Sequence, residues 1–285
     1  AAVMGPIIPP SSAMIMYGYY TELSVGKLFL GGLIPGVLLG LGLMVVNHII
    51  ARHRRYDFVK PKRSIKEILL TTYRSIGALI MPMIIVLGIV FGVFTPTESG
   101  IAATVYGLFY GLVISRKLKL KRLPAVLVDS ANTTSIVMII LAMAGIFSNV
   151  LTRLQFQSVI IENFVTPIQN PYLATLSIML IIIILGCFID PSVLIVMFGS
   201  TVAAIGRNLG FDPIHYGVLM VITMLYGAIT PPVGSMLYIS CAIAGIPLEK
   251  SVRVLSPFLI VQCLIMLAVL FIPGLSLWVN ELVFR

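Results

Sequence analysis

Residues 227–236 read Gly-Ala-Ile-Thr-Pro-Pro-Val-Gly-Ser-Met, which places two adjacent prolines inside an apolar segment. A proline inside a helix removes one backbone hydrogen bond and clashes with the preceding turn, so two in a row leave several carbonyl oxygens without intrahelical partners. In hydrocarbon those oxygens have to be satisfied by neighbouring helices or by a cation. The stretch therefore predicts a broken membrane helix, over about residues 214–246.

The composition of the whole chain places this break in a lipid bilayer. Of the 285 residues, 59% are hydrophobic and 10% are charged, and the mean hydropathy is +1.09. Runs such as 28–46, 79–94 and 176–189 are nearly free of charge, and a helix needs about 20 apolar residues to cross the hydrocarbon. The sequence thus predicts an all-α polytopic membrane protein and excludes a soluble fold.

The basic residues gather in two loops. Seven of the 19 lie within 52–66 and five lie within 116–122. Lysine and arginine in short loops beside spans mark the cytoplasmic side of a membrane protein. Two apolar segments between the loops, about 68–94 and 98–115, carry the chain out and back, so both loops lie on one side. These loops account for the net charge of +9, and nucleic acid is not expected as a partner.

A second proline pair aligns with the first without gaps. Residues 5–14 read Gly-Pro-Ile-Ile-Pro-Pro-Ser-Ser-Ala-Met and match residues 227–236 at an offset of 222. At the same offset Pro35 falls on Pro257, each within a long apolar segment that follows the break. This agreement indicates an internal repeat rather than chance similarity between apolar segments.

The two copies run in opposite directions across the membrane. The segment 26–51 runs inward because Arg52 follows it, whereas the last span, about 257–283, runs outward because Lys250 and Arg253 precede it. Inverted repeats are characteristic of secondary transporters, which hold substrate and coupling ions at the repeat interface. The sequence therefore predicts an inverted-repeat fold.

Three parts of the chain follow from this alignment. Residues 1–51 form the end of the first repeat, 52–94 contain the basic cytoplasmic loop, an interfacial helix near 64–74 and a span, and 95–285 form the second repeat. Because residue 1 corresponds to residue 223, we expect a complete protein with more than a hundred further residues before Ala1, including a first hairpin.

The region 172–205 is apolar apart from an interruption at Asp190-Pro191-Ser192. Two complete spans and a re-entrant hairpin are the competing interpretations. The second segment, 193–205, holds about 13 apolar residues and a span needs about 17. The sequence therefore favours a re-entrant hairpin whose tip is Asp190-Pro191-Ser192.

These breaks carry the candidate functional residues. An ionisable side chain at membrane depth is costly, so Asp190 is a functional hypothesis; it also has the position of a helix cap, and the two roles are compatible. The half-helix that begins after Asp190 offers unpaired N–H groups to an anionic substrate. Freed carbonyls and the hydroxyls of Ser11, Ser12 and Thr230 form an all-oxygen set suited to Na⁺. A packed kink without an ion is the alternative at each proline pair.

Other polar residues have simpler interpretations. Glu98 begins a span after Thr95 and is predicted to be a capping-box acid. Asn132 and the two threonines after it line a polar path or pack and cap a helix. The cysteines show no Cys-x-x-Cys spacing, which argues against disulfides and zinc, and the scattered histidines are interpreted as interfacial. Nothing resembles a nucleophile–base pair, a metal triad or a P-loop, so the sequence offers no enzyme site. The cysteines and histidines of the sequence are Cys187, Cys241, Cys263, His48, His53 and His215.

Five motifs in this order are similar to the large membrane subunit of tripartite ATP-independent periplasmic (TRAP) transporters, the DctM-like family. They are Gly-Pro-Ile-Ile-Pro-Pro-Ser at 5–11, Gly-Val-Phe-Thr-Pro-Thr-Glu at 92–98, Asp-Pro-Ser at 190–192, Asp-Pro-Ile-His-Tyr-Gly at 212–217 and Thr-Pro-Pro-Val-Gly at 230–234. The resemblance covers the C-terminal two-thirds or so of a typical subunit. One departure is Asn132, which stands where many relatives have an arginine before the Thr-Thr pair, so an anion contact by that arginine is not carried over.

The resemblance implies a Na⁺-coupled, elevator-type importer in a bacterial inner membrane, with Na⁺ as coupling ion and no organic cofactor. Its partners would be a small membrane subunit and a periplasmic binding protein that delivers a carboxylate-bearing substrate. Carried over by motif, one cation site would contain Pro9, Pro10, Ser11 and Ser12. The other would contain Ser192, Thr230, Pro232, Val233 and Gly234, and the substrate would be flanked by Asp190, Pro191, Ser192, Thr230 and Pro231.

Two other functions compete with this interpretation. A stand-alone Na⁺/carboxylate symporter of related architecture would need no binding protein. A membrane structural subunit would have no transport site of its own. An intramembrane enzyme ranks behind both, because no catalytic constellation is present in this sequence.

Overall fold

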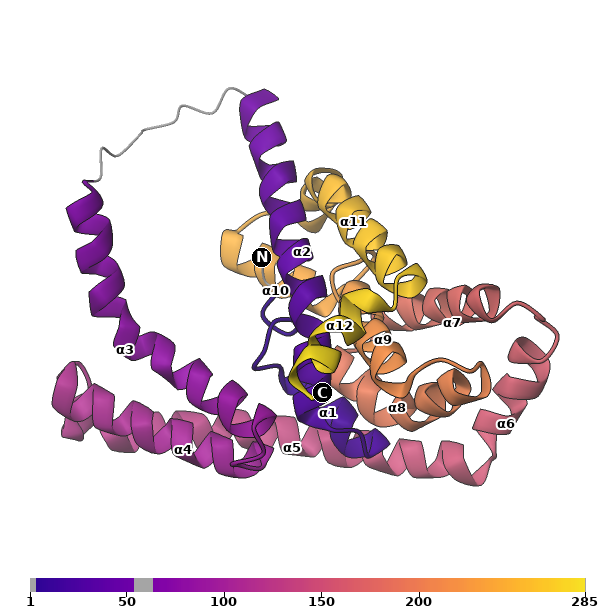
Figure 1. The fold of residues 1–285 in the computed structure, drawn as a ribbon, viewed down its shortest axis with the longest axis horizontal. Helices are drawn as coiled ribbons and strands as arrows, with labels where there is room; N and C mark the ends of the chain where they lie inside the picture. The colour runs from indigo at the N-terminus through magenta and orange to yellow at the C-terminus, as the bar shows by residue number, and fades with distance from the viewer. Residues whose placement is uncertain (1–3, 54–63, 285) are drawn as a thin grey trace. The chain divides into compact units, whose positions relative to one another are not determined.

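The described part of the protein is helical throughout. The computed structural model describes residues 4–53 and 64–284, and these contain helices and turns without a β-strand (Figure 1). This confirms the predicted all-α fold class. A π segment, Tyr110–Ile114, continues α4, another, Ile161–Val165, continues α6, and a 3-10 turn, Leu120–Arg122, leads into α5. In chain order the α-helices are α1 (Ser12–Thr21), α2 (Val25–His53), α3 (Ile65–Val90), α4 (Pro96–Phe109), α5 (Leu123–Arg153), α6 (Phe156–Ile160), α7 (Pro171–Gly186), α8 (Pro191–Asn208), α9 (Pro213–Gly227), α10 (Ser235–Ala244), α11 (Leu248–Phe271) and α12 (Gly274–Val283).

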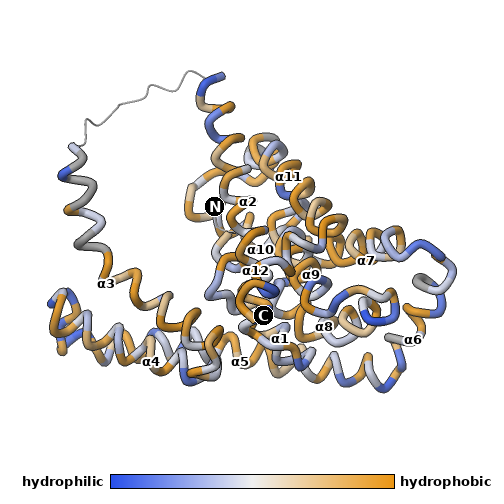
Figure 2. The backbone as a smooth tube through the Cα atoms, viewed as in Figure 1, coloured by the Kyte–Doolittle hydropathy of each residue, from blue (hydrophilic) through white to orange (hydrophobic). Residues whose placement is uncertain are grey.

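The described part of the chain contains both long and short apolar helices. Among the described residues, four stretches are long and apolar enough to cross a membrane: Val25–His53, Pro96–Ile114, Leu120–Arg153 and Val254–Phe271. The helices beside the predicted breaks are shorter, and α7, α9 and α10 have 10 to 16 residues. Figure 2 shows hydrophobic residues along α3, α7 and α11, with hydrophilic residues at the C-terminal end of α2. This pattern fits a polytopic membrane protein with interrupted helices.

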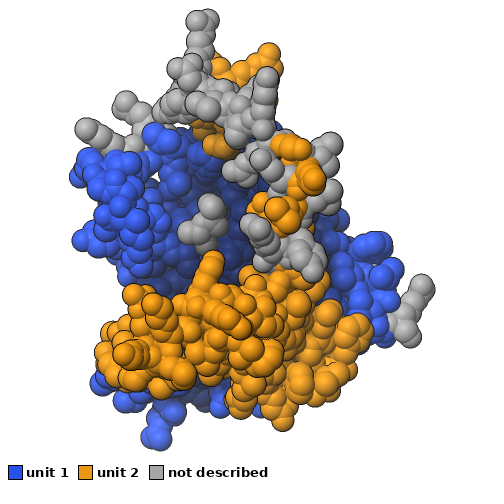
Figure 3. Space-filling view, turned by 90° about the vertical axis from the view of Figure 1, so that its left-hand side faces the viewer, with its two compact units in different colours: residues 1–46, 137–285 blue, residues 47–136 orange. Residues whose placement is uncertain are grey.

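The chain divides into two compact units, which Figure 3 colours separately. The first unit contains residues 1–46 and 137–285, and the second contains residues 47–136. The hairpin, both proline pairs and α7 to α12 all belong to the first unit. The second unit consists mainly of α3 and α4.

Helix α9 is the core of the first unit. Every residue from His215 to Leu225 is buried, and α7, α8, α11, α12 and α1 all pack against it. A helix that is hydrophobic on all sides has to be enclosed by other helices. Tyr17 of α1 enters this core, with its ring against Gly217 of α9 and near Gly199 of α8.

Helix α1 runs along α8. Tyr17 of α1 lies near Gly199 of α8, and one turn further along α1 the carbonyl oxygen of Thr21 accepts from the guanidinium of Arg207 at 3.4 Å. The segment before α1 packs on α2, where Gly32 and Gly36 leave room for Ile7 and Ile8. Small residues at such positions let membrane helices and irregular segments approach closely.

The second unit is built on the pair α3 and α4. The hydroxyl of Tyr106 donates to the carbonyl oxygen of Gly77 at 2.7 Å across the two helices. At the start of α4, Thr95 and Glu98 form a reciprocal capping box, with the Thr95 N–H donating to Glu98 at 2.8 Å. The prediction of Glu98 as a capping-box acid is therefore confirmed.

The two proline pairs precede the same order of elements. Each is followed by a ten-residue helix, α1 or α10, that ends at a left-handed residue, Glu22 (φ 58°) or Gly245 (φ 65°). Each is then followed by a long helix with an internal proline, Pro35 in α2 or Pro257 in α11. This order agrees with the aligned repeat, while the opposite orientation of the two copies stays a prediction.

Three sequence expectations differ from the structure. Residues near 64–74 do not form a separate helix, because α3 is assigned without interruption from Ile65 to Val90, with Pro82 inside it; the basic loop itself, 54–63, lies outside the described residues. The last span, about 257–283, is divided because a residue before proline is disfavoured in the helical region, and Ile272 before Pro273 is non-helical (φ −123°, ψ 84°). His215 is buried rather than interfacial, and its Nδ1 lies 2.7 Å from the Ser276 hydroxyl.

Candidate cation and substrate site

The structure joins the hairpin tip to the second proline break. Helix α7 ends at Gly186 and α8 begins at Pro191, and the N–H of Gly234 donates to the carbonyl oxygen of Cys187 at 2.8 Å. The hydroxyl of Ser235 lies 3.4 Å from the second carboxylate oxygen of Asp190. The two helices of the hairpin have 16 and 18 residues, or about 24 and 27 Å, less than the roughly 30 Å of hydrocarbon. The 18 residues of α8 also reach the roughly 17 that a span needs, so the re-entrant hairpin stays a prediction.

A glycine contact between α7 and α9 sets the distance between these two loops. A Cβ atom on Gly186 would lie 2.9 Å from the Cα of Gly227, and one on Gly227 would lie 2.7 Å from the Cα of Gly186. Both distances are shorter than real Cβ contacts, so the two backbones touch where any side chain would separate them. The contact lies directly before both loops and brings them into hydrogen-bonding range.

Asp190 caps α8 and keeps one carboxylate oxygen for another partner. Its backbone is extended, and its first carboxylate oxygen accepts from the N–H of Ser192 at 2.9 Å. The side chain is exposed, and its second oxygen faces Ser235. Because this carboxylate already offsets the positive end of the helix, the N-terminus of α8 attracts an anion less than a neutral cap would. The site is therefore better suited to a cation, or to substrate hydroxyl groups, beside Asp190.

Oxygen atoms of residues 228–234 converge around Gly234. Gly234 has φ 51°, and a Cβ atom at this residue would lie 3.0 Å from the carbonyl oxygens of both Ala228 and Thr230. Thr230 also contributes a hydroxyl, which donates to the carbonyl oxygen of Tyr226 at 2.7 Å and keeps its lone pairs available. Carbonyl and hydroxyl oxygens are the ligands that hard cations prefer. The residues of this break fit Na⁺ chemically.

The remaining predicted residues of this break lie on its outer side. Pro232 and Val233 are exposed and Pro231 is half-buried, whereas Gly234 is buried. The Pro231-Pro232 bond is cis, as is the Pro9-Pro10 bond. Two residues that the sequence did not single out, Ser235 and Gly186, complete the contacts described above. An isolated glycine in an apolar helix is a general sign of close backbone approach, and that sign was present at Gly186.

The first proline break has a different environment. Ser11 is fully buried, and its hydroxyl donates to the carbonyl oxygen of Pro6 and accepts from the N–H of Met14 at 3.1 Å. Ser12 begins α1 and is exposed, and Pro9 and Pro10 are half-buried. No hydrogen bond among the described residues joins this break to the hairpin tip. Ser11 thus acts as the N-cap of α1, and its role in a first cation site stays a prediction.

Helix α5 carries the polar residues 132–134, of which Thr133 is hydrogen-bonded within the helix. The hydroxyl of Thr133 donates to the carbonyl oxygen of Asp129 at 2.9 Å, and Asn132 is exposed. Cys187 and Cys241 are buried, and all three cysteines are free thiols. Within the described ranges no group of three histidine, cysteine or carboxylate side chains is placed to hold a metal ion.

The family model and the relatives that match this chain all belong to the same family of transporter subunits. A family model for the DctM component of the tripartite ATP-independent periplasmic transporter matches residues 1–275. The chain is 39% identical to the C4-dicarboxylate TRAP transporter large permease protein DctM of Pseudomonas aeruginosa, over 97% of this chain and 65% of that protein. It is 32% identical to the sialic acid TRAP transporter large permease protein SiaM of Vibrio cholerae, over 99% of this chain and 66% of that protein.

A third relative is longer. The isethionate TRAP transporter permease protein DctMQ of Oleidesulfovibrio alaskensis is 30% identical over 98% of this chain and 44% of its own length. The chain thus spans about two thirds of the length of the large permease relatives and less than half of this one. The relatives are named for different substrates, so the similarity extends across proteins of different specificity.

Proposed function

Because the chain belongs to the family of DctM components of tripartite ATP-independent periplasmic transporters, we propose that it forms a transport site of an inner-membrane permease that imports an organic acid together with Na⁺. The observation that carries this proposal is the hydrogen-bonded junction between the hairpin tip and the second proline break, at Cys187 and Gly234. Broken helices that meet in this way place unpaired backbone groups at membrane depth, where secondary transporters bind substrate and ions.

The oxygen atoms around Gly234 support Na⁺ as the coupling ion. The carbonyl oxygens of Ala228 and Thr230 both lie close to Gly234, where the Ala228 oxygen also accepts from the N–H of Met236 at 3.1 Å, and the Thr230 hydroxyl belongs to the same loop. Asp190 supplies a negative charge at the adjoining tip. A cation between these groups would tie α10 to α8, so its binding would order the surface on which the substrate rests.

The substrate in this proposal is an acid that the binding protein selects. The relatives named above for C4-dicarboxylate and sialic acid suggest a carboxylate-bearing substrate. Asp190 already compensates the end of α8, so the substrate carboxylate would bind elsewhere in the junction, on unpaired backbone N–H groups of the breaks. The Asp190–Ser235 pair would then contact hydroxyl or carbonyl groups of the substrate.

A small membrane subunit and a periplasmic binding protein are the proposed partners. The family is described as tripartite and periplasmic, which agrees with a permease that receives its substrate from a soluble protein. An elevator motion of the first unit is part of the same proposal.

The test is uptake into proteoliposomes that contain the purified permease with its small subunit. Uptake of the radiolabelled acid should require both the binding protein outside and an inward Na⁺ gradient, and replacing Na⁺ by K⁺ should abolish it. Uptake without the binding protein would support the stand-alone symporter. Absence of uptake with every component present, in protein that is folded by size-exclusion chromatography, would support a structural subunit.

A further inference from the structure

Helix α5 carries an exposed apolar face that ends at a basic residue. Ile136, Ile139, Met143 and Ile146 are each more than 60% exposed, and their spacing of three and four residues places them on one face. The span that contains them ends at Arg153. An arginine at the end of a span lies at the level of the lipid headgroups, where its side chain reaches polar atoms.

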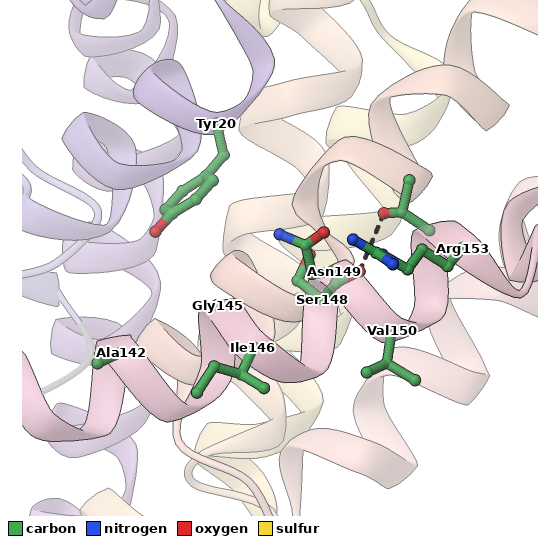
Figure 4. Close-up of a pocket in the computed structure, with 9 residues that line it drawn as sticks. Tyr20, Ala142, Gly145, Ile146, Ser148, Asn149, Val150 and Arg153 are labelled. Atoms are coloured by element: carbon green, nitrogen blue, oxygen red, sulfur yellow. Dashed lines mark hydrogen bonds between the residues drawn. The ribbon is translucent and has the colours of Figure 1, made fainter.

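A groove lies on an adjacent face of the same helix, within the first unit. Its volume is about 780 Å³, within the roughly 300 to 1,000 Å³ typical of small-molecule sites. Tyr20 of α1 reaches toward it, while Asn149 and Arg153 project from α5 (Figure 4). Along α5 the lining changes from the small residues Ala142 and Gly145 to the polar residues Asn149 and Arg153, over about 16 Å. The groove is therefore apolar at one end and polar at the other.

The polar end consists mainly of hydrogen-bond donors. The guanidinium of Arg153 takes part in no ion pair or hydrogen bond found among the described residues. The amide of Asn149 and the residue Ser148 line the groove beside it, whereas the Tyr20 hydroxyl points toward the Ala142 end (Figure 4). A guanidinium with neutral donors beside it complements a phosphate group.

We propose that this groove binds an anionic phospholipid. The phosphate lies at Arg153 and Asn149, and an acyl chain lies over Ala142 and Gly145. Both ends of the groove match this amphiphile, whereas a free anion would use only the polar end. The proposal is independent of the proposed transport function, because none of these residues belongs to the junction of the hairpin and the proline break.

Two variants test the two ends of the groove separately. Arg153→Gln removes the charge and keeps hydrogen-bonding atoms, and Arg116→Gln is its control on an exposed arginine of the second unit. Gly145→Leu fills the apolar end. A Cβ atom on Gly145 meets nothing within 4 Å, so the substitution is compatible with the fold, and Gly100→Leu is its control at an equally open position on α4.

The measurement is lipid retention by the purified protein in native mass spectrometry, with phosphatidylglycerol and phosphatidylcholine of identical acyl chains. The wild type should retain phosphatidylglycerol more strongly. Arg153→Gln should weaken phosphatidylglycerol about five-fold, as expected for one basic residue near a phosphate, and weaken phosphatidylcholine less, because its choline cation offsets the charge of its phosphate. Gly145→Leu should weaken both lipids, and both controls should match the wild type.

Three outcomes would overturn the proposal. Equal retention of the two lipids by the wild type would show an unselective contact with the bilayer. Unchanged phosphatidylglycerol binding in Arg153→Gln would show that Arg153 does not contact the phosphate. Binding of inorganic phosphate that is lost in Arg153→Gln, with lipid retention unaffected by Gly145→Leu, would identify a site for a free anion instead of a lipid.

Discussion

At the scale of single residues, Asp190 combines a capping role with a charge, and the two can be separated. Asparagine caps a helix as well as aspartate does, so Asp190→Asn should keep the bond to the Ser192 N–H and lose only the charge. We expect stability to change by less than about 1 kcal/mol and Na⁺-dependent uptake to fall at least about ten-fold, since a hydrogen bond to a charged group contributes about 1.5 to 3 kcal/mol.

The control for Asp190→Asn is Asp212→Asn. Asp212 also precedes a proline and caps α9, with its carboxylate accepting from the N–H groups of Ile214 and His215 at 2.9 Å. It lies outside the junction, so its variant should transport normally. Equal losses of uptake in the two variants would show that the charge of Asp190 acts only through its helix.

Gly234 gives a second prediction at this scale. Gly234→Ala adds a methyl group within 3.0 Å of two carbonyl oxygens in a left-handed backbone, whereas Gly210→Ala faces open space at φ 80°. Both variants should lose about 1 to 2 kcal/mol from the left-handed conformation, but only Gly234→Ala should also weaken Na⁺ binding. Thermal unfolding in detergent with and without Na⁺ measures both effects, and equal Na⁺ stabilisation of the two variants would contradict the role of this loop.

Residue-level roles were predictable from sequence where the partner is local. Glu98 pairs with Thr95, three residues earlier. Asp190 accepts from the N–H of Ser192, two residues later, and so caps α8. The contact of Asp190 with Ser235 spans 45 residues, and no local pattern specifies it. The contact of His215 with Ser276 on α12 spans 61 residues, so no local pattern predicts the burial of His215 either.

At the scale of elements, the contact between α7 and α9 is the most sensitive point. Gly227→Ala would push a methyl group into the backbone of α7 at Gly186, and overpacking of this kind costs about 1 to 3 kcal/mol. We expect a lower unfolding midpoint and a weakened bond between Cys187 and Gly234. Gly145→Ala is the control, because it meets no atom within 4 Å and replaces glycine in a helix, which should stabilise by up to about 1 kcal/mol. An unchanged midpoint in Gly227→Ala would show that the two helices can separate without cost.

Element boundaries followed the sequence where prolines and glycines mark them. The hairpin tip and the break after α9 were predicted because Asp190-Pro191 and Pro231-Pro232 interrupt apolar runs. The joining of residues 64–74 to the following span was not predicted, because the change from amphipathic to apolar composition suggested a boundary, whereas the proline, Pro82, lies further along inside α3. Pro273 marks the end of α11 at Phe271, because it disfavours the helical conformation of Ile272 before it.

At the scale of the whole molecule, the sequence determined the class of protein more clearly than its mechanism. Composition and charged loops specify a polytopic helical protein, and the fixed offset between the proline pairs specifies a repeat. The packing of α9 at the centre of the first unit depends on contacts among five other helices, and these are not encoded locally. The site therefore emerges only when the fold brings the hairpin tip to the break.

Na⁺ binding is the central claim. A cation at the proline break would contact the loop and the two helices beside it, and its binding would be coupled to transport. Thr230 and Thr223 provide a matched pair on this question. Each hydroxyl donates to the carbonyl oxygen four residues earlier, at 2.7 and 2.8 Å, but Thr230 lies at the break and Thr223 lies inside α9. Valine removes the hydroxyl at either position and keeps the shape.

The most direct test is equilibrium binding of radioactive ²²Na⁺ to the purified wild type and to these two variants. We predict saturable binding by the wild type, at least about ten-fold weaker binding at the second site by Thr230→Val, in line with the loss of one strong ligand, and wild-type binding by Thr223→Val. Wild-type affinity in Thr230→Val, or an equal loss in both variants, would contradict a cation site at the proline break.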